Sequence, residues 1–79
     1  MPTVYRVAGY RFFFFSREGT EPPHIHVDSA GRYAKFWLSP VALSRSVGYN
    51  AKEIRHLRDL IAEHREEFQE KWNEYFSRA

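Results

Sequence analysis

The sequence contains no cysteine, so neither a disulfide framework nor a thiolate metal site is available to it. The longest apolar run, Phe12 to Phe15, falls far below the ~20 residues that a transmembrane helix needs. Met1 to Gly9 lacks the apolar core of a secretion signal, and we therefore expect a cytoplasmic protein without membrane association. Neither sign of charge is in large excess, since the net charge of +2 is too small to indicate a nucleic-acid binder by itself.

Aromatic residues, by contrast, are abundant and make up 18% of the 79 residues. A chain of this length forms one domain with one small core. Because a few rings fill such a core, some of the rings are expected at the surface or at an interface. We expect a single domain over residues 1–79, with a sheet part at 1–48 and a helical part at 49–79.

The hydrophobic pattern predicts an α+β fold: a small antiparallel sheet of three to four strands packed on a long or bent C-terminal helix. The N-terminal aromatic residues 5–16 indicate one strand bent at Gly9 or two short strands. Residues 24–28 and 32–38 are typical of strands and are predicted to form a hairpin through Ser29 to Gly31. Residues 41–47 indicate either a last edge strand or an irregular crossing segment.

The helical part begins at a recognisable capping box, in which Asn50 and Glu53 are spaced to satisfy each other's backbone N–H groups. Apolar residues then recur every three or four positions, except at the step His64-Arg65. A continuous helix over 51–77 would run about 40 Å at 1.5 Å per residue, longer than a small domain is wide. We therefore expect a break or bend near His64, or a second half that packs on another subunit.

Strand parity assigns side chains to the two faces of the sheet, because alternate residues of a strand point in opposite directions. The aliphatic set is expected to meet the helix; it comprises Ile25, Val27, Ala34, Phe36 and Leu38. The opposite set comprises His24, His26, Asp28, Tyr33, Lys35, Trp37 and two of the four consecutive phenylalanines. The face away from the helix is thus predicted to hold part of the aromatic surplus.

Two histidines at positions i and i+2 of a strand, His24 and His26, point to the same side and can suit one divalent metal ion. Asp28, next in the same row, is the candidate third ligand or a partner of a ligand. Without an obvious third ligand, however, the pattern favours two histidines that hydrogen-bond to backbone or water.

The same imidazoles are candidate catalytic groups, because His24 or His26 could shuttle protons while Arg11, Arg32 or Lys35 holds a phosphate. That reading predicts a ribonuclease or a metal-dependent hydrolase. The sequence shows no nucleophile motif, phosphate-binding loop or paired carboxylates to strengthen it, so the pattern favours a protein that is not an enzyme.

The third hypothesis is that the sheet face away from the helix is a binding surface. Its candidate residues are Arg11, His24, His26, Arg32, Tyr33, Lys35 and Trp37. Rings and cations together suit the bases and phosphates of single-stranded RNA or DNA. Such a face more often seals a homodimer or contacts a partner protein, and we favour that interpretation.

Four segments of the chain resemble the bacterial family of domains of unknown function numbered 4160. They are Met1 to Val4, Tyr10 to Phe15, Glu21 to Val27 and His64 to Trp72, and the Pro-Pro-His-x-His-Val stretch is the most specific of them. The resemblance implies a small cytoplasmic bacterial protein encoded beside another short protein. It also implies one component of a toxin–antitoxin-like module, which acts through a partner protein, with RNA or DNA as a further candidate partner. The motif positions that the resemblance marks as candidates are His24 and His26.

Overall fold

Five antiparallel strands, each paired with the next along the chain, form one sheet in the computed structural model, which describes residues 3–17 and 19–76. The strands are β1 (Thr3–Val7), β2 (Tyr10–Phe13), β3 (His24–Ser29), β4 (Arg32–Leu38) and β5 (Val41–Val47). The α+β class is confirmed, but the predicted number of three to four strands is wrong. The N-terminal segment gives two strands, and residues 41–47 give a full edge strand. Met1, Pro2 and the predicted helical residues 77–79 lie outside the described residues.

Two hairpin turns of the same kind set the register of the first four strands. The turn between β1 and β2 consists of Ala8 (φ 52°) and Gly9 (φ 84°), and that between β3 and β4 consists of Ala30 (φ 47°) and Gly31 (φ 79°). Positive φ at both central residues is the type I′ geometry, whose twist matches that of the flanking strands. The predicted hairpin of residues 24–38 is confirmed.

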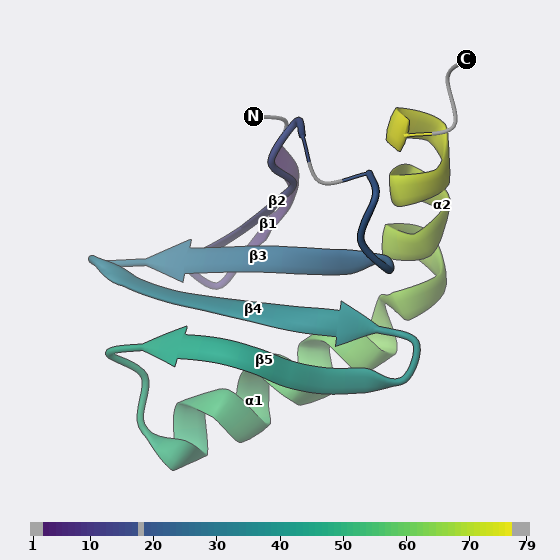
Figure 1. Ribbon diagram of the computed structural model, residues 1–79. Coiled ribbons are helices and arrows are strands. Elements are labelled where there is room, and N and C mark those ends of the chain that lie inside the picture. Colours follow the sequence, from purple (N-terminus) through teal and green to yellow (C-terminus); the bar gives the residue numbers. More distant parts are fainter. Residues whose placement is uncertain (1–2, 18, 77–79) are drawn as a thin grey trace.

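Two helices follow the sheet, α1 (Ala51–Glu63) and α2 (Arg65–Phe76). The predicted capping box is present: the Glu53 backbone N–H donates to the Asn50 side chain over 2.8 Å, and the Asn50 N–H donates to the Glu53 carboxylate over 3.0 Å. The predicted break near His64 is also confirmed, because His64 ends α1 and α2 begins at the next residue. Figure 1 shows α1 running along the sheet beside β5, and α2 turning away to pass the ends of β3 and β4.

The core lies between the sheet and the helices and has the composition that strand parity predicted. Its fully buried members from the sheet include Ile25, Val27, Ala34, Phe36 and Leu38, and those from the helices include Leu57, Ile61 and Phe68. Within the described part of the chain, neither helix is both long enough and apolar enough to cross a membrane.

Candidate binding surface on the open face of the sheet

The face of the sheet turned away from the core, which we call the open face, carries most of the predicted site residues. Its side chains come from the middle strands β2, β3 and β4 and from the residues that follow β2. They are Arg11, Phe13, Phe15, His24, His26, Asp28, Tyr33, Lys35 and Trp37. Two of the four consecutive phenylalanines, Phe13 and Phe15, lie here as parity predicted.

Aromatic rings enclose the imidazole of His26. Its ring centroid is 5.4 Å from that of Phe13, which is stacked on it, and 4.5 Å from that of Phe15. The Tyr33 ring is stacked at 5.8 Å, and its hydroxyl lies 2.7 Å from His26 Nδ1. His26 is therefore on the predicted face but only 1% exposed, so a bound molecule meets the rings before it meets the imidazole.

His24 is buried at the end of β3 where α2 passes. Its Nδ1 donates a hydrogen bond to the Pro22 carbonyl oxygen over 2.9 Å. Its ring lies 4.8 Å from that of Trp72 in α2 and 5.6 Å from that of Trp37. Sequence parity finds Trp37 as a neighbour, but Trp72 reaches His24 only through the path of α2.

Asp28 is engaged by Arg11, its direct partner across β2 and β3. The guanidinium donates two hydrogen bonds to the carboxylate, from Nε over 3.2 Å and from Nη2 over 2.9 Å. The hydrogen bond to Asp28 raises the pKa of Arg11 above its usual value, burial opposes this to a lesser extent, and the charge of Asp28 adds a still smaller increase. The guanidinium also lies 4.3 Å from the centre of the Phe13 ring, which fixes it against the floor of the open face.

Lys35 is likewise held by a carboxylate of the same chain. Its Nζ donates to Glu21 over 2.8 Å and lies 4.6 Å from the centre of the Trp37 ring. Glu21 was not among the predicted site residues, because it belongs to the loop before β3 and no strand periodicity places it opposite Lys35.

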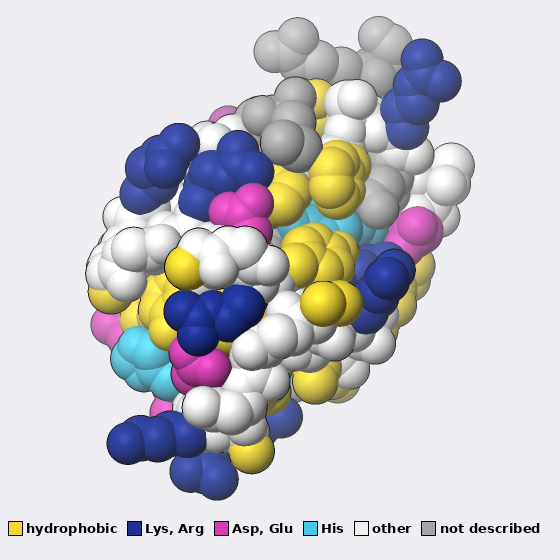
Figure 2. All heavy atoms as spheres, turned by 90° about the vertical axis from the view of Figure 1, so that its left-hand side faces the viewer, with side chains coloured by type: hydrophobic (Ala, Val, Ile, Leu, Met, Phe, Trp, Pro, Cys, Tyr) yellow, Lys and Arg dark blue, Asp and Glu magenta, His cyan; other side chains and the backbone are white. Residues whose placement is uncertain are grey.

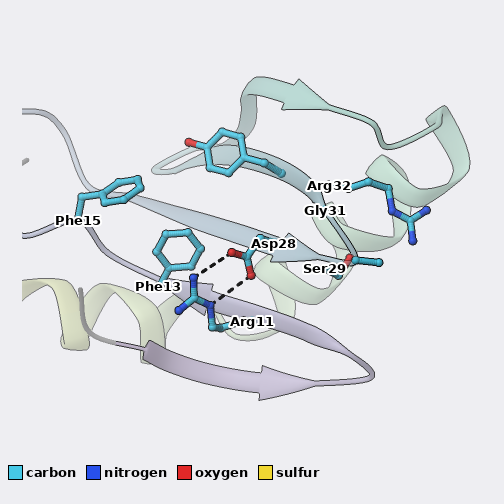
Figure 3. Close-up of a pocket in the computed structure, with 9 residues that line it drawn as sticks. Arg11, Phe13, Phe15, Asp28, Ser29, Gly31 and Arg32 are labelled. Atoms are coloured by element: carbon cyan, nitrogen blue, oxygen red, sulfur yellow. Dashed lines mark hydrogen bonds and ion pairs between the residues drawn. The ribbon is translucent and has the colours of Figure 1, made fainter.

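Arg32 lines the same hollow as Arg11, at the β3–β4 turn, but its guanidinium is held on the helix side of the sheet. It has the parity of Ala34 and Phe36, and its guanidinium donates to Glu53 of α1 over 2.9 Å. In Figure 3 its side chain points away from the pair formed by Arg11 and Asp28. The parity that assigns Tyr33 to the open face could have found this difference from the sequence.

A hollow of about 510 Å³ opens beside the pair formed by Arg11 and Asp28. Its wall is formed by Phe13, Phe15 and Tyr33, and its far end by the β3–β4 turn (Figure 3). Phe15 is 40% exposed, so part of its ring is open to solvent beside the hollow. Figure 2 shows hydrophobic side chains reaching the surface between basic and acidic ones, with histidine atoms visible among them.

The predicted metal ligands do not come together as a ligand set. Among residues 3–17 and 19–76, no group of three or more His, Asp or Glu side chains is arranged to hold a metal ion. The rings of His24 and His26 lie 5.0 Å apart and perpendicular to each other, and the Asp28 carboxylate faces Arg11. Metal binding by these three residues stays a prediction.

The geometry suits recognition better than proton transfer. The hollow offers flat rings and one carboxylate–guanidinium pair, whereas the imidazoles lie beneath the rings. The three cations of the predicted set, Arg11, Arg32 and Lys35, each form an ion pair with a carboxylate of the chain. A phosphate would have to compete with those carboxylates for the same donors.

Comparison with known proteins places the chain in a family but not beside a characterised relative. No curated protein and no solved structure gives a significant match. The family model described as Domain of unknown function (DUF4160) matches residues 9–73, which includes the whole of β2, β3, β4, β5 and α1. The chain therefore belongs to the family of domains of unknown function numbered 4160.

Proposed function

We propose that the chain is the binding component of a toxin–antitoxin-like pair, acts in the cytoplasm, and works by docking a partner protein on its open face. The observation that carries the docking is the hollow lined by Phe13, Phe15 and Tyr33 beside the pair of Arg11 and Asp28, and the toxin–antitoxin-like role rests on the resemblance to the family. Among these rings Phe15 is exposed, Tyr33 is half-buried and Phe13 is buried. An aromatic anchor beside a few fixed polar groups is typical of protein interfaces.

Burial of the imidazoles favours binding over catalysis. His24 is 0% exposed and His26 is 1% exposed. A general acid or base must come within hydrogen-bond reach of its substrate, and here the rings of Phe13, Phe15 and Tyr33 stand in between. A ribonuclease or hydrolase centred on His24 and His26 would need those rings to move.

The ion pairs of the open face favour a protein partner over RNA or DNA. Nucleic-acid affinity comes largely from cations that neutralise phosphates, and Arg11 and Lys35 are already neutralised by Asp28 and Glu21. A protein surface can instead complement the mixed charges and cover Phe15.

The test is co-purification of the chain with the short protein encoded beside it, both produced together and only the neighbour carrying an affinity tag. Phe15→Ser should abolish the interaction by removing the exposed ring. Tyr75→Ser is the matched control, because Tyr75 is a similarly exposed ring (36% against 40%) on α2. Retention of the Phe15→Ser variant, or equal loss of both variants, would contradict docking on the open face.

A growth assay of the same pair tests the module itself. One of the two proteins produced alone should slow growth, and production of both should restore it. With Phe15→Ser, production of both proteins should no longer restore growth, whereas with Tyr75→Ser it should. Growth that is unaffected by either protein would contradict the toxin–antitoxin-like role while leaving the docking result to stand by itself.

The remaining alternatives give different readouts on the purified chain. A single-stranded nucleic-acid platform predicts oligonucleotide binding at low salt that Trp37→Ala weakens. A homodimer sealed by the open face predicts a dimer by sedimentation that Phe15→Ser converts to a monomer. An enzyme predicts RNA hydrolysis that His26→Gln abolishes without loss of thermal stability.

A further inference from the structure

A second hollow, of about 590 Å³, lies between the edge strand β5 and the helix α1, and we call it the β5–α1 groove. Its walls include Leu43, Tyr49, Ile54, Arg55 and Arg58. None of these residues belongs to the open face.

We propose that the β5–α1 groove is a docking site for an extended segment of a protein that combines acidic and apolar side chains. The proposal is independent of the function proposed above, because it uses neither the rings nor the ion pairs of the open face.

The apolar half of the groove is supplied by both of its walls. Leu43 on β5 is 38% exposed, and Ile54 on α1 packs only partly against the core. An incoming apolar side chain would cover Leu43 and Ile54 and so remove apolar surface of both partners from water.

The charged half is uniformly basic. Arg55 and Arg58 lie three residues apart on α1 and so project to the same side of the helix. The acidic residues Asp59 and Glu63 do not line the groove. A segment that enters the groove therefore meets two guanidinium groups and no carboxylate.

These two arginines differ from the cations of the open face. Within residues 3–17 and 19–76, neither Arg55 nor Arg58 forms an ion pair, although Asp59 lies four residues after Arg55. Their donors are available to carboxylates of a partner without first breaking an internal pair, and guanidinium–carboxylate contacts are among the strongest hydrogen bonds in proteins.

The edge position of β5 adds backbone groups to the site. β5 stands at the end of the strand order, so its outer side faces no other strand of the described chain. An extended segment can hydrogen-bond along such an edge while its side chains enter the groove.

A second copy of the chain fits the groove poorly. A two-fold interface uses one patch twice, so it would bring the arginines of both copies into one interface whose printed lining offers no carboxylate to either pair. Charge complementarity therefore points to an acidic segment.

The probe for the test is a short fluorescein-labelled peptide that alternates glutamate and leucine, compared with a peptide in which glutamine replaces each glutamate. Fluorescence anisotropy with the full chain should show binding of the glutamate peptide at low ionic strength. The glutamine peptide should bind more weakly, by a factor of about ten or more, because two charge-assisted contacts are lost. No binding at low ionic strength, or equal binding of both peptides, overturns the proposal.

Variants locate the binding on the chain. The double variant Arg55→Glu with Arg58→Glu should lower the affinity for the glutamate peptide by about tenfold or more. Lys52→Glu with Lys71→Glu makes the same change in net charge at exposed helical positions that do not line the groove, and it should leave affinity within about twofold. Equal weakening by both pairs would show attraction to net charge alone and overturns the site.

Two further variants complete the assignment. Leu43→Ser should lower the affinity for the glutamate peptide by removing an apolar contact. Phe15→Ser on the open face should leave that affinity unchanged. If Arg55→Glu with Arg58→Glu reduces the folded fraction by circular dichroism, Arg55→Gln with Arg58→Gln replaces it. Displacement of the peptide by a single-stranded oligonucleotide that depends on the same arginines would assign the groove to phosphates instead.

Discussion

His26 and Tyr33 are diagonal neighbours on the open face, and the imidazole Nδ1 of one lies 2.7 Å from the hydroxyl of the other. Direct partners across β3 and β4 pair His26 with Lys35 and Tyr33 with Asp28. The contact therefore runs two residues along the strand, a distance within reach of a long aromatic side chain. It ties the wall of the hollow to the buried imidazole.

This contact predicts that Tyr33→Phe lowers the free energy of unfolding by about 1 kcal/mol, the usual net contribution of one hydrogen bond. His26→Ala should lower it by about 3 kcal/mol, because it also removes a buried ring that Phe13 and Phe15 contact. Urea unfolding followed by circular dichroism measures both. His56→Ala, at an exposed position of α1, should change stability by less than about 0.5 kcal/mol; a similar small effect of His26→Ala would mean that its ring is not structural.

Arg65 connects the helix break to the end of β4. Its Nε donates to the Leu38 carbonyl oxygen over 2.7 Å, and its Nη2 donates to the Ser39 hydroxyl over 2.9 Å. Arg65→Met keeps much of the side-chain length but removes both donors, and it should lower the free energy of unfolding by about 1–3 kcal/mol. Chemical denaturation tests this, with the exposed Arg58→Met as control. An equal effect of the two changes would contradict a specific role of Arg65.

Local sequence patterns predict much of this fold because they are physically local. Alternation in residues 24–38 depends only on the pleat of a strand, and it correctly places Ile25 in the core and His26 on the opposite face beside Phe13. The capping box depends on residues three positions apart. The missing apolar step at His64 marks the point where a straight helix would leave the core, and α1 ends there.

The burial of the candidate site could not be predicted in the same way. His24 is covered by Trp72, which lies 48 positions later in the sequence and arrives only because α2 turns at His64. Lys35 is held by Glu21 from a loop that has no periodicity. Arg32 is different, since parity alone places it on the helix side, and grouping it with Arg11 by charge overlooked that signal.

Variants at the cap of α1 separate the two roles of Glu53, which completes the capping box with Asn50 and pairs with Arg32. Asn50→Ala removes the acceptor of the Glu53 N–H and should lower the free energy of unfolding by about 1 kcal/mol. Glu53→Gln preserves the capping box geometry but removes the charge that faces Arg32, so its smaller effect should shrink as salt is added. Thermal unfolding at low and high salt distinguishes them. A salt-dependent effect of Asn50→Ala would contradict this division.

Tyr49 predicts a loss of stability at alkaline pH. Burial raises the pKa of Tyr49 above its ordinary value of 10.0, and the hydrogen bond with Ser29 lowers it by less. The folded chain therefore holds the phenol proton more tightly than the unfolded chain does. The stability linked to that proton is fully present below about pH 10 and is lost as the pH rises through the folded pKa.

Tyr49→Phe should lose less stability than the wild type between neutral and alkaline pH, although it costs about 1 kcal/mol at neutral pH through the lost Ser29 contact. Urea unfolding at both pH values tests this, and Tyr75→Phe, which alters an exposed ring, should keep the alkaline loss of the wild type. An alkaline loss in Tyr49→Phe as large as that of the wild type would assign the titration to another group.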